Sequence, residues 1–129
     1  MAYTIDRKFS GESFENVVER VRAALLSEGF GVLTEIDVQA TFKKKLSADV
    51  PKYLILGACN PNMAHEAMKL EPRVGAMLPC NVIVRQTADE TVEVNAIDPA
   101  ASMAAIDNDD LKSVAGQVRQ MMEKVVSNI

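Results

Sequence analysis

The feature that most constrains the fold is an apolar run that leads into a Cys-Asn-Pro sequence. Residues 53–56 read Tyr-Leu-Ile-Leu, and such an unbroken run is typical of a strand buried on both faces in the middle of a sheet. Asn60 is a preferred helix N-cap, and Pro61 is a preferred first helical residue. We therefore predict a helix from Pro61 toward Leu70, which cannot continue through Pro72. The chain must turn from a strand into a helix within a few residues.

A second segment repeats the Cys-Asn pair of the first. Cys59 and Asn60 occur in Ile-Leu-Gly-Ala-Cys-Asn-Pro, and Cys80 and Asn81 occur in Leu-Pro-Cys-Asn-Val. Cysteine supplies a soft nucleophile or metal ligand, asparagine supplies a donor and an acceptor, and proline fixes the backbone. If the two strands that carry these pairs are neighbours, joined through the helix after Pro61, the pairs lie close enough to share a ligand. We interpret them as two halves of one polar pocket.

The composition is that of one globular domain covering residues 1–129. The chain is 48% hydrophobic and 25% charged, which allows a core without metal or disulfide cross-links. Its 14 basic and 18 acidic side chains give a net charge of -4, which argues against nucleic acid as a partner because phosphate binding depends on lysine and arginine. No apolar run approaches the ~18 residues of a membrane span, and the amino terminus lacks a signal-peptide pattern. We expect a soluble, cytoplasmic protein without a membrane partner, whose two cysteines are free thiols or a transient pair.

The residues before the first motif predict alternating strands and helices. Residue periodicity indicates a strand over 3–9, a helix over 13–28 and a strand that begins at residue 30. In the second of these strands, one face is expected to carry Phe30, Val32, Thr34 and Ile36. Leu33, Glu35 and Asp37 then fall on the other face, if the strand continues that far.

Residues 37–46 fit two structures. Val38, Ala40 and Phe42 alternate as they would in a strand. Val38, Phe42 and Leu46 also line one face of a helix, and Asp37 is a suitable cap for it. We favour the helix, with the lysines at 43–45 on its solvated side.

The residues around and after the second motif predict a hairpin and a final helix. Residues 74–85 and 91–97 read as two strands joined by a short polar turn. Residues 100–108 resemble a linker, and Asp109 or Asp110 is the expected cap of the last helix. The apolar stripe of that helix consists of Leu111, Val114, Val118, Met121 and Val125.

Several segments together resemble the domain of unknown function family 302. The segments are Glu35-Ile36-Asp37-Val38, Lys44-Lys45-Leu46, Ile55-Leu56-Gly57-Ala58-Cys59-Asn60-Pro61, Ala64-His65, Leu78-Pro79-Cys80-Asn81-Val82 and Ile97-Asp98-Pro99. The resemblance covers nearly the whole chain. It implies an α+β fold in which a curved, mainly antiparallel sheet of the TATA-binding-protein-like type packs against helices, in small prokaryotic proteins that can pair as homodimers. It implies no established activity, and the fold transfers no DNA-binding role to an acidic chain.

The two cysteines differ in their expected surroundings. Cys80 falls on the same face of its predicted strand as Val82 and Val84. Its thiol is therefore expected to point into the core, where a free cysteine packs as a small apolar side chain. Cys59 precedes a predicted helix, whose N-terminal amides stabilise a thiolate. A polar or reactive role and simple packing fit Cys59 equally well, and Cys59 is the one candidate for a reactive thiol and for a catalytic residue.

The two asparagines also differ. Asn60 is most simply a helix cap. Asn81 interrupts an apolar strand, and no predicted helix begins after it, so a capping role does not explain it. It is therefore the stronger candidate for contact with a ligand. Glu35 joins the candidate pocket if its strand continues, although a solvated or ion-paired carboxylate is the simpler interpretation.

A metal site is a weaker possibility. Its candidate ligands are Cys59, His65 and Cys80, but residues 59 and 65 do not have the spacing that aligns side chains on one helix face. No cofactor is identified by the sequence.

Three functions are compatible with these residues. We favour a module that binds a small molecule or ion in a pocket formed by Glu35, Cys59, Asn60, Cys80 and Asn81. The first alternative is a thiol-dependent enzyme or sulfur carrier in which Cys59 reacts and Cys80 resolves. The second alternative is a structural or interaction domain without a ligand.

Overall fold

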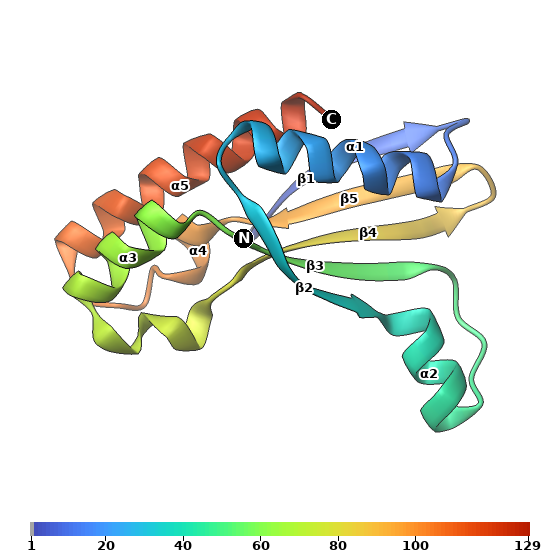
Figure 1. Cartoon of the computed structure of the whole chain (residues 1–129), viewed down its shortest axis with the longest axis horizontal. Helices are drawn as coiled ribbons and strands as arrows, with labels where there is room; N and C mark the ends of the chain where they lie inside the picture. The colour runs from blue at the N-terminus through green and yellow to red at the C-terminus, as the bar shows by residue number, and fades with distance from the viewer. Residues whose placement is uncertain (1) are drawn as a thin grey trace.

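The computed structural model describes residues 2–129, and its centre is one five-stranded sheet (Figure 1). All neighbouring strands are antiparallel, and their order across the sheet is β1-β5-β4-β3-β2. The strands are β1 (Thr4–Ser10), β2 (Gly31–Asp37), β3 (Tyr53–Cys59), β4 (Cys80–Ala88) and β5 (Thr91–Ile97). The architecture is α+β with an antiparallel sheet packed against helices, as the family resemblance implies.

Two long helices cover one face of this sheet (Figure 1). They are α1 (Phe14–Ser27) and α5 (Asp109–Ser127), which pack against each other and against the sheet. The main core lies between these helices and the strands, and its fully buried members include Val17, Val21, Leu25, Leu56, Val82, Val84, Val92, Val94, Met122 and Val125.

The other side of the sheet is called the open face below. Strand alternation places these side chains on it: Asp6, Tyr53, Asn81, Ile83, Arg85, Glu93 and Asn95. No helix within residues 2–129 lies across the middle of this face (Figure 1). An antiparallel sheet with one covered and one open face explains why apolar and polar residues alternate along β5.

The remaining helices extend the fold beyond the sheet (Figure 1). α3 (Pro61–Leu70), the 3-10 helix η1 (Pro72–Met77) and α4 (Pro99–Ser102) gather near the first half of α5. Their buried residues form a second core with α5, made of Ala67, Val74, Met103, Leu111 and Ala115. α2 (Val38–Leu46) projects from the opposite end of the sheet and buries none of its residues.

Side-chain caps determine where four of the helices begin. Ser13, Asp37, Asn60 and Asn108 each accept a hydrogen bond from the backbone N–H three residues later, at 2.9 to 3.3 Å. The predicted start of α3 after Asn60 is confirmed, and so is the helical interpretation of residues 37–46.

Three predictions of local structure were wrong. Residues 74–77 belong to η1 because Glu71 caps a turn that begins at Pro72, so β4 starts only at Cys80. The expected linker 100–108 contains most of α4. The last helix is capped by Asn108, and the two aspartates that follow occupy its first turn.

Strand β2 does not keep one face from residue 30 to residue 36. Its register with β3 shifts between Val32 and Thr34, as at a β-bulge. Val32 therefore faces the helices, whereas Thr34 and Ile36 face the open side and Glu35 faces the helices. The predicted common face of Phe30, Val32, Thr34 and Ile36 is therefore wrong after the bulge.

Strand β3 is buried on one face only. Leu54 and Leu56 point into the core, but Tyr53 and Ile55 are half-buried on the open face. The strand lies between two others, as expected, yet the predicted burial on both faces was wrong because the second face carries no layer of helices.

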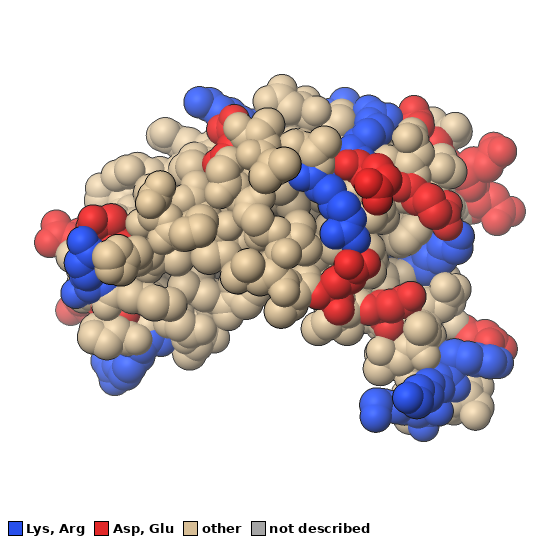
Figure 2. Space-filling view, viewed as in Figure 1, with Lys and Arg blue, Asp and Glu red and all other residues tan. Residues whose placement is uncertain are grey.

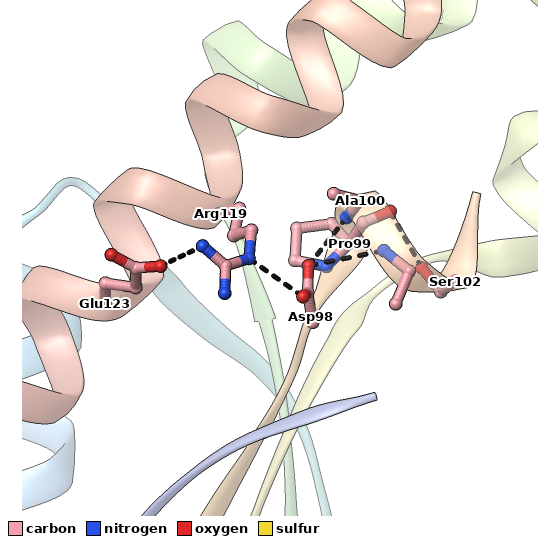
Figure 3. A network of polar contacts seen from close by, with 7 residues as sticks. Asp98, Pro99, Ala100, Ser102, Arg119 and Glu123 are labelled. Atoms are coloured by element: carbon pink, nitrogen blue, oxygen red, sulfur yellow. Dashed lines mark hydrogen bonds and ion pairs between the residues drawn. The ribbon is translucent and has the colours of Figure 1, made fainter. Parts of the chain in front are cut away.

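A polar junction holds the end of β5 to α5. Asp98 caps α4 through the backbone N–H groups of Ala100 and Ala101, at 2.9 and 3.3 Å (Figure 3). Its other carboxylate oxygen accepts a hydrogen bond from Nε of Arg119 at 2.8 Å, and Arg119 also forms an ion pair with Glu123. The Ile97-Asp98-Pro99 segment therefore has a structural role.

Candidate ligand-binding site on the open face

The two Cys-Asn pairs lie side by side because β3 and β4 are neighbours. Ala58 is opposite Cys80, and Gly57 is opposite Asn81. Each pair stands at the end of its strand that is nearer α3. The pairs are adjacent, although their side chains do not all point the same way.

The two thiols lie on opposite faces of the sheet. Cys80 is buried in the core, and its register partner in β3 is Ala58. Cys59 is the next residue after Ala58, so its side chain points to the opposite side of the sheet, where it is half-buried. Burial, with a smaller contribution from the nearby Cys59, raises the pKa of the Cys80 thiol from 9.0 to about 11. Both cysteines are free, and this geometry disfavours Cys80 as a resolving thiol for Cys59.

Gly57 explains how the open face is shaped near Asn81. A Cβ atom at Gly57 would collide with Oγ1 of Thr34 and would lie 2.8 Å from Cγ of Pro79. The side chains of Thr34 and Pro79 therefore occupy the space above Gly57. A larger residue at position 57 would displace them from beside Asn81.

The other candidate residues have separate surroundings. Asn60 caps α3 and donates a hydrogen bond from Nδ2 to the carbonyl of Glu28 at 3.3 Å, as expected for a structural residue. Glu35 faces the helices and pairs with Arg22 of α1 at 2.8 Å. Asn81 is exposed on the open face. The five residues proposed from the sequence thus do not line one common cavity.

The residues considered for a metal site are not grouped. His65 is exposed on α3, while Cys80 faces the core. Among residues 2–129, no three His, Cys, Asp or Glu side chains are placed to hold a metal ion.

The open face contains a hollow of about 500 Å³. It is lined by Tyr3, Thr4, Asp6, Tyr53, Asn81, Ile83, Arg85, Glu93, Asn95 and Ile97. β1, β3, β4 and β5 all contribute side chains, so the sheet itself is the floor of the hollow. Asn81 is the one residue of the predicted pocket that lines it.

A hydrogen-bonded network centred on Asn95 occupies part of this floor. Nδ2 of Asn95 donates to Asp6 Oδ1 at 2.6 Å and to Glu93 Oε1 at 2.8 Å. Oδ1 of Asn95 accepts from Arg85 Nε at 2.9 Å, and Nη2 of Arg85 donates to Glu93 Oε1 at 2.9 Å. Asn95 is only 8% exposed, and all of its polar atoms are bonded. The network therefore fixes the positions of the three charged side chains around it.

The network contains two carboxylates and one guanidinium, and Lys8 adds a second positive charge opposite Glu93 in the strand register. The hydrogen bond from Asn95 and the positive charge of Arg85 lower the pKa of the Glu93 carboxyl, so Glu93 is ionised at neutral pH. Oδ2 of Asp6 and Oε2 of Glu93 accept no hydrogen bond from any residue within 2–129. These oxygens remain able to accept hydrogen bonds from a bound molecule.

The sequence-based reasoning missed this network. In the sequence, the network could have been recognised from β5, where Thr91, Glu93 and Asn95 alternate with valines and so indicate a polar face. Asp6 has the same alternation in β1, but only the strand register shows that it lies opposite Asn95. The strand order, which the sequence left undetermined, is what brings Arg85 to the same place.

A second hollow lies beneath α1, on the helix-covered side, with a volume of about 360 Å³. Its charged groups pair with one another, as in Arg22 with Glu35 at 2.8 Å and Lys52 with Glu15 at 2.6 Å. The hydrogen bond from Lys52 also lowers the pKa of the Glu15 carboxyl. Because these partners satisfy each other, the hollow beneath α1 offers a ligand fewer free polar groups than the open face does.

Comparisons with known proteins agree on the family and the fold. The family model described as "Domain of unknown function DUF302" matches residues 5–129. The chain is also similar to the crystal structure of an uncharacterized conserved DUF302 protein from Bacillus stearothermophilus, with a TM-score of 0.91 and 23% identity over 99% of this chain and 98% of that chain. No curated protein matches the chain. At this identity, the structural match shows a shared fold and assigns no ligand.

Every helix within residues 2–129 is too short or too polar to span a bilayer.

Proposed function

The chain belongs to the family described as domain of unknown function DUF302, and we propose that this member is a small-molecule-binding module whose site is the hollow on the open face. The observation that carries the proposal is the network around Asn95. The buried amide of Asn95 fixes two carboxylates and a guanidinium at the floor of the uncovered hollow. Polar groups held in fixed positions in this way suit the recognition of a ligand. No bond-forming or bond-breaking step is part of the proposal.

The polar groups of the hollow favour a ligand rich in hydrogen-bond donors. Asp6 and Glu93 each present a carboxylate oxygen without a partner in residues 2–129, and Asn81 presents an exposed amide. Arg85 is bonded to Glu93 and Lys8 lies opposite Glu93 in the strand register, so both positive charges stand nearest Glu93 and the Asp6 carboxylate has no bonded cation within residues 2–129. An amine or a polyhydroxylated compound matches this set better than an anion, because an anion would meet two carboxylates.

The apolar part of the lining favours a ligand with a flat side. Ile83 and Ile97 form apolar floor between the polar groups, and Tyr3 and Tyr53 stand among the lining residues. Aromatic rings of this kind bind through large apolar area while leaving the hydroxyl available for a hydrogen bond. We therefore propose an aminated or hydroxylated ring compound as the ligand class.

Asn81 is the residue of the sequence-based pocket that this proposal retains. Cys59 lies on the same side of the sheet as Asn81, two residues beyond Gly57, but it does not line the hollow. Glu35, Asn60 and Cys80 lie outside it. The binding role of Asn81 comes from its exposure on the open face.

A thermal-shift screen with amino sugars, nucleosides and aromatic amines tests the proposal. A ligand that binds the folded protein raises its melting temperature, and the increase grows with ligand concentration. We expect Asn81→Ala to reduce this increase while Asn62→Ala, a change at an exposed position of α3, leaves it intact. If Asn81→Ala and Asn62→Ala behave alike, or if Arg22→Ala in the hollow beneath α1 abolishes the shift instead, the proposed site is wrong.

A further inference from the structure

A small enclosed hollow lies where the second core meets the main one, between α3, α4, α5 and the start of β4 (Figure 1). Its volume of about 30 Å³ is enough for one ion or one molecule of the size of water. It shares no residue with the hollow on the open face, so the proposed function does not use it. Among residues 2–129, no side chain that lines it carries a nitrogen or an oxygen atom, so its side chains offer no strong hydrogen bond to a polar ligand.

The lining of this enclosed hollow is rich in sulfur. Cys80 reaches it from β4, Met63 from the first turn of α3 and Met103 from the C-cap of α4. Three of the eleven lining residues carry sulfur, against nine of 129 in the whole chain, so sulfur is gathered there more than composition requires. The three side chains come from different elements, and only the fold brings them together.

The thiol of Cys80 is buried without a polar partner. Cys80 is 8% exposed, belongs to no disulfide and forms no hydrogen bond through its thiol within residues 2–129. Met103 is buried as well, whereas Met63 is only half-buried. Met63 therefore connects the enclosed hollow with the surface, and it marks the side from which a ligand enters.

The surface on this side is uncharged. The first five residues of α3, at positions 61–65, include no Asp, Glu, Lys or Arg, and Figure 2 shows mainly uncharged side chains where α3 begins. Asn60 caps this turn by accepting a hydrogen bond from the N–H of Met63 at 3.3 Å. A hard cation such as Mg²⁺ or Ca²⁺, which prefers oxygen ligands, finds no carboxylate on this turn.

From this arrangement we propose that Cys80, Met63 and Met103 form a binding site for one copper(I) ion. Thiolate and thioether sulfur are the soft ligands that select copper(I) over harder divalent ions. A single thiolate cancels the charge of copper(I), so the bound pair brings no net charge into the apolar surroundings. A zinc ion would leave one positive charge uncompensated there. The flexible methionine side chains can adjust their sulfur atoms to the ion.

Binding at this site exchanges a proton for the metal. The S–H bond of Cys80 breaks, its electron pair stays on sulfur and is donated to copper(I), and the proton passes to solvent. Each methionine donates a sulfur lone pair and loses no group. Copper keeps its oxidation state, so the step needs no oxidant or reductant.

Anaerobic competition for copper(I) with the chelator bicinchoninate tests the site in the full chain. We expect the chain to remove one copper(I) ion per molecule from the coloured chelate. Cys80→Ser and Met103→Leu should each lower the affinity at least about tenfold, because the loss of a ligand costs no less than the loss of a group that supports one. Equally tight binding of zinc in the same chain would overturn the proposal.

Two matched variants are the controls. Cys59→Ser removes the other thiol, and Met122→Leu changes a buried methionine of α5 that does not line the enclosed hollow. Both should keep the affinity of the wild type, and circular dichroism shows that each variant is folded. Because leucine nearly matches methionine in volume, Met103→Leu and Met122→Leu disturb packing to a similar degree. Equal losses of affinity in these two variants, or in Cys59→Ser and Cys80→Ser, would overturn the assignment.

X-ray absorption at the copper edge of the copper-loaded wild type depends on no variant. We expect the copper(I) ion to be coordinated by sulfur alone. Nitrogen among its ligands, as from His65 on the exposed side of α3, would contradict the site. So would a chain that takes no copper(I) from bicinchoninate.

Discussion

The two cysteines are expected to differ in reactivity, because their side chains point to opposite faces of the sheet. Cys59 is half-buried at the end of β3, whereas Cys80 is in the core with a pKa of about 11. We predict that iodoacetamide at pH 8 modifies Cys59 first, because the Cys80 thiol is both covered and protonated. Peptide mass spectrometry over time measures the two rates. Equal rates at the two positions would contradict the burial of Cys80.

The raised pKa of Cys80 also predicts a pH dependence of stability. The Cys80 thiol loses its proton near pH 9.0 in the unfolded chain and near pH 11 in the folded chain. The contribution of the protonated thiol to the free energy of unfolding is therefore complete below pH 9.0 and is lost as the pH rises toward 11. Between pH 8 and pH 10 the wild type should lose about 1 kcal/mol more free energy of unfolding than Cys80→Ala. Urea unfolding of both proteins at the two pH values makes the comparison, and equal losses would exclude a proton-linked role.

Gly57 is expected to be sensitive to a single added carbon. Gly57→Ala brings a methyl group against the side chains of Thr34 and Pro79, and the proline ring cannot rotate away. We predict a loss of about 1–3 kcal/mol in the free energy of unfolding. Gly31→Ala is the matched control, because a Cβ there meets nothing within 4 Å. Similar urea midpoints for the two variants would show that the neighbours of Gly57 move aside.

Among the elements, α3 depends on its cap. Asn60 accepts a hydrogen bond from the N–H of Met63 and also donates to the carbonyl of Glu28, so it joins α3 to the end of α1. Asn60→Ala should cost about 1 kcal/mol of stability, with or without a ligand. Asn62→Ala on the same helix should stay within about 0.5 kcal/mol of the wild type. Thermal melts that rank these variants the other way would contradict the capping role.

Local signals predicted most elements and failed where local structure depends on distant parts of the chain. Asn60 with Pro61, and Asp37, marked helix starts correctly because a cap is a short-range contact. The bulge after Val32 was missed because only pairing with β3 creates it. α4 was missed because four residues carry no periodic pattern, and its cap Asp98 is held in place by Arg119 from a distant helix.

For the molecule as a whole, the sequence predicted the class of fold but not which faces would meet solvent. The adjacent Cys-Asn pairs follow from the neighbouring strands β3 and β4, yet alternation sends Cys80 and Asn81 to opposite sides. The candidate site was therefore foreseen at Asn81 alone. Asp6, Arg85, Glu93 and Asn95 could not be grouped without the strand order β1-β5-β4.

The most direct test of the proposed function is a map of where small molecules bind the ¹⁵N-labelled chain. Backbone amide shifts recorded with a library of amine- and hydroxyl-bearing ring fragments should concentrate at Asp6, Asn81, Arg85 and Asn95, and Asn81→Ala should weaken them. Shifts that cluster instead beneath α1, at Arg22 and Glu35, or that stay absent from the open face with every fragment, would contradict the account.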